Sequence, residues 1–406
     1  MLWSATGGFL VRCFQFAFGV ALARLLPPSD FGVIGLLGLF LALSTTLADC
    51  GFSAALVRKP DRSSDDCVTV LLFSTAVSLC VYAALFAAAP AIAAFFRQPV
   101  LEPVVRVMAL GVVFGALRSV PLALLRIRLA FRLQAAVDVA AMVGSGAAGV
   151  LMALRGLGVW ALVGQGLVWH VLSLVLTWAA SRWRPRGAFS GRSCREFFSF
   201  GWRHLGSSLI DSAYGNLPSL VIGRLFGVAQ LGLFSRADSW TQLPAQIVEG
   251  AAVNVNYPLF AAVQNDRARL AAAYHRVLLV CLAVLAAAAS ALVLLARPLV
   301  GFLLGEAWLP AAGLIGLLSP AVVAGPLSAL ALNLLYVRNR PDLALRLELV
   351  KKPIALGLLA AGLFFGVPGV CLAKSIASLV ALAVNVWCAE RQLASAGPEC
   401  RGEKVL

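Results

Sequence analysis

The chain is poor in the residues from which soluble enzymes build metal centres and catalytic sites. Only 13% of its 406 residues are charged, and three are histidines. His170, His204 and His275 show no ligand spacing, and the nine cysteines include no Cys-x-x-Cys pair. We therefore expect no metal, no disulfide and no cofactor, and we interpret most cysteines as small apolar residues.

Two further absences narrow the class of protein. There is no Gly-x-x-x-x-Gly-Lys-Ser/Thr motif, so the chain itself is not expected to consume ATP. No segment between apolar runs is long enough to fold as a soluble domain. This counts against membrane glycosyltransferases, ligases and polymerases, which need acidic catalytic residues on a substantial external loop. We expect a protein that is not an enzyme.

What the chain does contain is apolar. Hydrophobic residues make up 61% of it, too many to bury in a water-soluble core. The net charge of +15 would suggest nucleic acid as a partner in a soluble protein, but here the basic residues lie in short segments between apolar runs. The sequence therefore predicts an all-α integral membrane protein that does not bind nucleic acid.

Twelve apolar runs approach the length of a membrane span. A helix of about 20 residues, rising ~1.5 Å per residue, crosses the ~30 Å hydrocarbon core. The expected spans are 3–24, 31–52, 68–94, 104–125, 134–154, 158–180, 201–223, 229–258, 272–295, 309–336, 344–365 and 368–389. The first lacks an Ala-x-Ala-type cleavage site, so we expect it to be an uncleaved helix.

Basic residues alternate between the two sides of this array. Clusters follow the even-numbered spans, as at Arg126, Arg128 and Arg132, whereas the segments after odd-numbered spans hold one arginine or none. Because basic residues concentrate in cytoplasmic loops, the even loops and both termini are predicted to be cytoplasmic.

The strongest basic segment, from Ser181 to Arg195, lies near the midpoint and contains five arginines. We interpret it as the linker between two membrane-embedded halves. The predicted organisation is a six-helix bundle over 1–180, a basic cytoplasmic linker over 181–200, a second six-helix bundle over 201–392 and a cytoplasmic tail over 393–406.

The two halves resemble each other. ARLLPPSDFG at 23–32 matches GRLFGVAQLG at 223–232, and LGVWALVGQ at 157–165 matches FGVPGVCLA at 365–373. The two matches occur in the same order. This indicates one ancestral unit used twice, as in many transporters.

Polar residues inside the spans locate a candidate path, because ionisable groups in hydrocarbon are costly unless they face water or a partner. One face of the first span carries Gly8, Arg12, Gln15 and Gly19. The corresponding residues of the seventh span are Ser208, Ser212, Gly215 and Ser219, with Asp211 beside them and Arg203 two turns earlier. We expect both spans to line a central cleft in which Arg12, Gln15, Arg203 and Asp211 bind substrate. The alternative is that the small residues mark tight helix packing.

Other charged residues near the span ends have two interpretations. Asp49 and Glu249, 200 residues apart, are candidates for binding a coupling cation or for gating, or they cap neighbouring helices at the interface. We expect Asp238 to pair with Arg236 on its own helix, and Lys374 to reach the interface by snorkelling. Arg118 and Asp138, in other spans, are also expected near the interface.

The sequence resembles the oligosaccharide flippases of the multidrug/oligosaccharidyl-lipid/polysaccharide exporter superfamily, in the branch that serves exopolysaccharide, teichuronic acid and colanic acid synthesis. The resembling segments are ALARLLPPSDFG (21–32), LADCGFSAALVRKPD (47–61), GVWALV (158–163), SRWRP (181–185), FGWRHLGSSL (200–209), LVIGRLFGVAQLGLFSRAD (220–238) and GEAWLPAA (305–312). Relatives often carry an Arg and an Asp just before the Ile-Gly-Arg motif, where this chain has YGNLPS at 214–219.

This resemblance implies a V-shaped, MATE-like transporter with a central cleft between its bundles. Its implied activity is to move polyprenyl-pyrophosphate-linked oligosaccharide across the bacterial cytoplasmic membrane by alternating access. Implied partners are membrane lipids, a polysaccharide polymerase and glycosyltransferases. Arg12 and Arg203 would contact the pyrophosphate, and Asp211, Asp49 or Glu249 would couple transport to a cation. The alternatives are a cation-coupled drug or metabolite antiporter and a non-transporting scaffold for glycosyltransferases.

Overall fold

The computed structural model describes residues 2–59, 61–262, 266–338 and 341–394. Within these ranges all regular structure is helical: 14 α-helices, one short 3-10 helix and no strand. Apolar segments of this length must satisfy their backbone hydrogen bonds internally, which helices do. The all-α prediction is confirmed.

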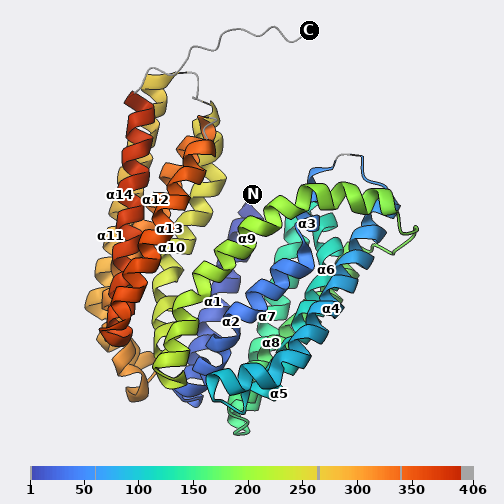
Figure 1. Cartoon of the computed structure of the whole chain (residues 1–406), viewed down its shortest axis with the longest axis horizontal. Helices are drawn as coiled ribbons and strands as arrows, with labels where there is room; N and C mark the ends of the chain where they lie inside the picture. The colour runs from blue at the N-terminus through green and yellow to red at the C-terminus, as the bar shows by residue number, and fades with distance from the viewer. Residues whose placement is uncertain (1, 60, 263–265, 339–340, 395–406) are drawn as a thin grey trace. The chain divides into compact units, whose positions relative to one another are not determined.

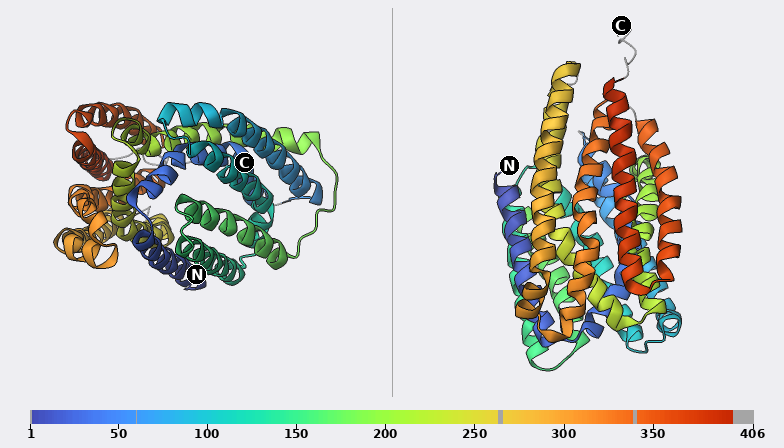
Figure 2. Two further views of the ribbon diagram at one scale, coloured as in Figure 1. Left: turned by 90° about the horizontal axis from the view of Figure 1, so that it is seen from below. Right: turned by 90° about the vertical axis from the view of Figure 1, so that its left-hand side faces the viewer.

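Two compact units make up the chain, Met1–Ser235 and Arg236–Leu406 (Figure 1). The helices of the first are α1 (Leu2–Leu25), α2 (Pro28–Asp49), α3 (Phe52–Arg58), α4 (Ser64–Phe96), α5 (Leu101–Met108), α6 (Leu110–Ile127), α7 (Phe131–Leu154), α8 (Val159–Ser181), α9 (Gly191–Leu225) and the start of α10 (Val228–Ala262). The second contains the rest of α10, α11 (Arg267–Leu303), the 3-10 helix η1 (Glu306–Trp308), α12 (Leu309–Val337), α13 (Pro341–Leu363) and α14 (Gly366–Ala394). The long helices of each unit run alongside one another (Figure 2).

Each of the twelve predicted spans coincides with a long helix, the fourth being α5 and α6 together. In the described part of the chain, nine stretches are long and apolar enough to cross a membrane. The other three helices, α9, α10 and α13, carry charged residues along their length, such as Asp211, Asp238 and Lys351. Membrane crossing by these three stays a prediction.

The boundary between the units differs from the expected linker. Helix α8 ends at Ser181 and α9 begins at Gly191, so only 182–190 connect them and the rest of the expected linker is helical. Helix α9 packs on α2, α3 and α4, which assigns it to the first unit. The bundle over 201–392 therefore stays a prediction, and 395–406 of the expected tail lie outside the described residues.

The same pairs of spans pack together in both halves of the chain. In the first, α4 packs on α6, and α8 packs on both α6 and α7; in the second, α11 packs on α12, and α14 on both α12 and α13. The second repeat match falls at equivalent turns: Gly158, with φ 55°, precedes α8, and Gly366, with φ 73°, begins α14. Glycine adopts this left-handed backbone without strain, which permits a tight helical hairpin in each half.

The first repeat match contacts its own counterpart. A Cβ placed on Gly32 would lie 1.7 Å from the carbonyl oxygen of Val228, and one placed on Gly232 would lie 1.8 Å from the carbonyl oxygen of Pro28. Residues 28 and 228, and 32 and 232, are the aligned positions of the two repeats. Such reciprocal contacts are what a two-fold relation between repeats produces.

Candidate functional site

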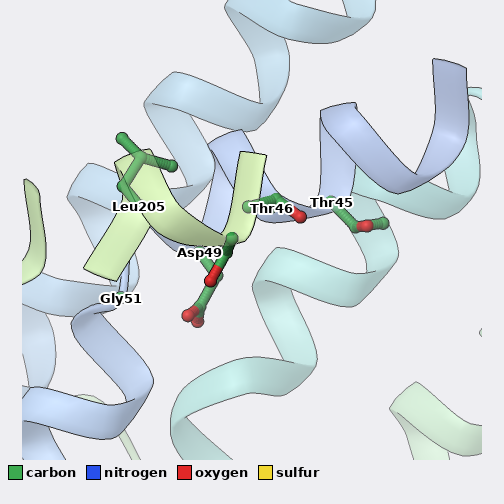
Figure 3. A pocket seen from close by; sticks show the side chains of 6 residues that line it. Thr45, Thr46, Asp49, Gly51 and Leu205 are labelled. Atoms are coloured by element: carbon green, nitrogen blue, oxygen red, sulfur yellow. The ribbon is translucent and has the colours of Figure 1, made fainter. Parts of the chain in front are cut away.

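A polar pocket lies where α2 ends against α9. Helix α2 stops at Asp49 because Cys50 and Gly51 take positive φ values of 48° and 72° and reverse the chain into α3. The reversal leaves a cavity of about 250 Å³ (Figure 3). The residues lining it are Thr45, Thr46, Asp49, Gly51, Leu205 and Ser208. A carboxylate and three hydroxyl groups therefore face one small space.

Polar side chains continue from this pocket along the α2–α9 interface. The Oγ1 of Thr46 lies 3.4 Å from the Oγ of Ser212. One turn further, the Asn216 amide donates to the Ser212 carbonyl oxygen at 2.9 Å. A Cβ on Gly38 of α2 would lie 3.0 Å from Oδ1 of Asn216, so the absent side chain leaves room for this amide. The Ser208 and Ser212 stripe predicted on the seventh span therefore faces α2.

Asp49 has a second role at the same place. Its carboxylate accepts a hydrogen bond from the Ser53 hydroxyl in the first turn of α3. This contact joins two side chains and satisfies no backbone N–H at the start of α3, so helix capping by Asp49 stays a prediction. The carboxylate also lines the cavity. Cation coupling or gating by Asp49 stays a prediction.

Three of the other predicted site residues, Arg12, Gln15 and Asp211, do not line this pocket. Arg12 is half-buried and Gln15 exposed on α1, which packs on α7, and neither lines the α2–α9 pocket. Asp211 is exposed on α9. The side chains of Arg203 and Glu249 lie outside the described part of the structure. Binding roles for these residues stay predictions.

An ion pair inside the first unit joins three spans. Arg118 of α6 donates through Nη2 to Oδ1 of Asp138 of α7 at 2.6 Å, and through Nε to Oγ1 of Thr177 of α8 at 2.9 Å. Its guanidinium also lies 5.6 Å from the ring centroid of Trp169. The Arg118 side chain is only 12% exposed, against 29% for Asp138. The sequence signal was an arginine and an aspartate in nearby apolar spans, but their pairing was not predicted.

A second ion pair lies in the second unit. Lys374 of α14 donates to the Asp238 carboxylate of α10, which also accepts from Nε2 of Gln242 at 2.7 Å. Lys374 is thus paired with a carboxylate of its own unit, and its snorkelling to the interface stays a prediction. The Arg236 guanidinium lies 5.8 Å from the ring centroid of Trp308. Residues i and i+2 of a helix point in different directions, which favours a partner for Asp238 on another helix.

A buried lysine connects the last three helices. The Nζ of Lys351 in α13 lies 2.6 Å from Oε1 of Glu348 and 3.0 Å from Oδ1 of Asn385 in α14. Asn385 is fully buried and donates to Oγ of Ser328 in α12 at 2.6 Å. A buried ammonium is costly unless it is hydrogen-bonded and paired, and these contacts supply both.

The basic segments of the first unit gather at one end. Lys59 lies 3.1 Å from carboxylate oxygens of both Asp66 and Glu196. Burial lowers the pKa of Lys59, but the hydrogen bonds and charges of Glu196 and Asp66 outweigh it and raise this pKa overall. Elsewhere at this end, Arg128 donates to the Ser181 carbonyl oxygen at 3.0 Å. The segments after the second, fourth and sixth spans thus share one end, as the charge alternation predicts (Figure 1).

This fold is shared with known membrane transporters. It matches the structure of the lipid II flippase MurJ in an inward closed conformation with a TM-score of 0.80 at 12% identity, over 96% of this chain and 88% of that one. It also matches an inward-facing multidrug resistance MATE family transporter of the MOP superfamily with a TM-score of 0.72 at 17% identity, over 94% of each chain. The fold is therefore that of MOP-superfamily transporters, as predicted.

The sequence defines the family within this class. A family model described as "Polysaccharide biosynthesis protein" matches residues 21–313, well over half of the chain. The chain belongs to this polysaccharide biosynthesis protein family, which confirms the resemblance noted above.

Two curated relatives are similar over most of this chain. The succinoglycan biosynthesis transport protein ExoT of Rhizobium meliloti is 28% identical over 298 residues, 73% of this chain and 60% of that protein. The teichuronic acid biosynthesis protein TuaB of Bacillus subtilis is 22% identical over 306 residues, 73% of this chain and 62% of that protein. The chain thus spans about 60% of the length of these relatives.

Proposed function

We propose that the chain translocates polyprenyl-pyrophosphate-linked oligosaccharide repeat units across the bacterial cytoplasmic membrane by alternating access, for exopolysaccharide or lipopolysaccharide synthesis, and that it is not an enzyme. Membership of the polysaccharide biosynthesis family supports this proposal. So do a relative named as a succinoglycan transport protein and a fold shared with a lipid II flippase.

The observation that carries the proposal is the row of polar groups along the α2–α9 interface. Thr45, Thr46, Asp49 and Ser208 face a pocket, and Ser212 extends the row, in a chain that is otherwise strongly apolar. Hydroxyl and carboxylate groups are suitable partners for sugar hydroxyls. A polar headgroup cannot cross hydrocarbon unaided, so it needs such a path while its prenyl tail stays in lipid.

The pyrophosphate would need cations in addition. In this proposal Arg12 and Arg203 contact it, and Gln15 and Asp211 bind the headgroup in a central cleft. Asp49 and Glu249 serve cation coupling or gating. The basic ends of the even loops would face the cytoplasm, together with both termini, where anionic lipids, glycosyltransferases and a polysaccharide polymerase would be the partners.

The test is flipping by the purified protein in proteoliposomes. The probe is a polyprenyl-pyrophosphate-linked saccharide that carries a nitrobenzoxadiazole fluorophore, and dithionite added outside reduces only the fluorophores in the outer leaflet. Protein-free liposomes reduce to about half their signal because the probe cannot cross. We expect the protein to make nearly the whole signal accessible. Reduction that stays at the protein-free level would contradict the proposal and favour a non-transporting scaffold.

One observation favours a second candidate, a cation-coupled drug or metabolite antiporter. The pocket at the α2–α9 interface is lined by the Asp49 carboxylate and by no basic residue. Such a lining suits a cationic guest. Extrusion of ethidium from cells that express the chain, driven by an imposed proton or sodium gradient and absent from the Asp49→Asn variant, would support this candidate over the flippase.

A further inference from the structure

We propose that the first unit carries a binding site for anionic glycerophospholipid headgroups where the end of α6 meets the segment that follows α8. We call this surface the α6/α8 basic patch and define it by Arg126, Arg128, Arg182, Trp183 and Arg184. It is separate from the α2–α9 pocket and does not depend on transport.

The backbone of the patch is held in place by packed apolar side chains. Ile127 and Trp183 both pack against the buried cluster that contains Phe52, Val120 and Leu124. The rings of Trp178 and Trp183 have centroids 5.6 Å apart, and Nε1 of Trp178 donates to the Leu117 carbonyl oxygen at 3.0 Å.

The four patch arginines are the sequence neighbours of these packed apolar residues. Arg126 and Arg128 flank Ile127 in the sequence, and Arg182 and Arg184 flank Trp183. The Arg128 guanidinium donates to the carbonyl oxygen of Ser181, the last residue of α8, at 3.0 Å. This bond fastens the end of α6 to the end of α8. All four arginines are exposed.

The positive charge of the patch has no acidic counterpart in its own segments. Residues 126–132 and 182–186 contain six arginines and no aspartate or glutamate. The basic segment 58–66 at the same end is different: its three basic residues are accompanied by three aspartates, and Lys59 pairs with Asp66 and Glu196. In the described part of the structure, no ion pair links the patch arginines to a carboxylate. Its charge is therefore available to an external anion.

Three features indicate that this anion belongs to a lipid. The patch lies at the ends of two helices that are long and apolar enough to span a membrane. Leu129, which directly follows Arg128, and Leu133, one turn further along the chain, are 70% and 49% exposed, which offers apolar surface to acyl chains. Tryptophan is enriched at membrane interfaces, and guanidinium groups bind phosphate oxygens through paired hydrogen bonds. An acidic protein would match the charge but would leave these leucines without an apolar partner.

Binding is measured with purified, delipidated protein by native mass spectrometry after titration with phosphatidylglycerol or phosphatidylcholine. We expect several-fold more phosphatidylglycerol bound. In the variant Arg126→Gln/Arg184→Gln the affinity for phosphatidylglycerol should fall about tenfold or more. Each basic residue near an anionic surface raises the affinity about fivefold, and the variant lacks two of them. Both side chains are exposed, and Arg128, which holds the two helix ends together, is unchanged. The matched control is Arg192→Gln/Arg195→Gln, which removes the same charge from exposed positions of α9.

Equal binding of the two phospholipids, or an equal loss in both variants, would overturn the proposal. So would preference for an acidic peptide such as polyglutamate, or for a polyprenyl pyrophosphate over phosphatidylglycerol at equal concentration.

A second measurement does not depend on the double variant. Phosphatidylglycerol brominated on its acyl chains should quench the fluorescence of wild-type protein more than that of Trp183→Phe, and identical quenching of both would also count against the site. Neither readout requires flipping, so failure of the proposed transport function leaves this test intact.

Discussion

Gly32 and Gly232 approach each other backbone to backbone near the starts of α2 and α10. A Cβ on Gly32 would lie 3.1 Å from the backbone nitrogen of Gly232, and one on Gly232 would lie 3.2 Å from that of Gly32. The two residues occupy aligned positions of the internal repeat, 200 residues apart. The repeat is therefore visible as a contact as well as a sequence similarity, and at this contact neither helix has space for a side chain.

Replacement of Gly32 by alanine should destabilise the protein by about 1–3 kcal/mol, because the added carbon collides with the carbonyl group of Val228 and the two helices must separate. Thermal unfolding in detergent measures the effect. Gly232→Ala should behave alike, and the double variant should lose less than the sum because both changes relieve the same contact. Gly115→Ala, where the added carbon meets nothing within 4 Å, is the control. An unchanged Tm for both single variants would contradict the contact.

Asp138→Leu should destabilise the first unit, because it leaves the Arg118 guanidinium without its carboxylate between three helices. Removal of one partner of a fully buried ion pair lowers the stability by about 3–5 kcal/mol. Because Asp138 is partly exposed, we expect Asp138→Leu to lower it by about 3 kcal/mol or less. Arg118→Met/Asp138→Leu should be more stable than Asp138→Leu alone, since no unpaired charge remains. The check is the order of the three Tm values in detergent, and a double variant below the single one would refute a structural pair.

Asn385→Leu should lower the stability of the second unit by about 1–3 kcal/mol, because the Lys351 ammonium loses an acceptor and the Ser328 hydroxyl loses a partner. The same substitution at Asn333, half-buried in α12, serves as the matched control. Unfolding monitored by tryptophan fluorescence compares the two. Equal destabilisation by both substitutions would show that the hydrogen bonds of Asn385 do not add to the stability of the protein.

Asp49→Asn should slow flipping of the fluorescent saccharide lipid about tenfold or more, equivalent to about 1.4 kcal/mol in the barrier. The amide keeps an oxygen for the Ser53 hydroxyl but removes the charge from the pocket. Asp61→Asn removes the same charge from an exposed position outside the helices and should leave the rate unchanged. A full rate for Asp49→Asn would leave that residue only its contact with the Ser53 hydroxyl.

Single cysteines in a background without the nine native ones test the orientation of the chain. A cysteine at Arg184, in the basic segment after α8, should react with an impermeant maleimide only after cells are opened. A cysteine at Phe365, 78% exposed between α13 and α14, should react in intact cells. The reverse pattern would invert the proposed topology.

Much of the fold could be predicted because it depends on local composition. Runs of about 20 apolar residues form helices wherever their surroundings are apolar, since no other structure satisfies the backbone there. This identified the twelve long helices in the part of the chain that the structure describes, and the alternation of basic clusters agreed with the shared end of the segments near Lys59, Arg128 and Ser181.

The domain boundary expected at 181–200 stays a prediction. The sequence did not reveal that the next helix, α9, packs back onto α2, because that contact depends on tertiary packing.

The candidate site was predictable only in part, because side-chain partners depend on helix rotation and packing. The regular spacing of Ser208 and Ser212 predicted a polar face, but only the tertiary structure turned it toward Thr46 and Asp49. The pairs Arg118–Asp138 and Lys374–Asp238 join helices through contacts between residues 20 and 136 positions apart. Composition and charge order determined that this chain is a helical membrane protein, and two sequence matches in the same order indicated its internal repeat. Which polar groups meet was decided by packing, because the charges buried between helices are stable only where a partner from another helix is within reach.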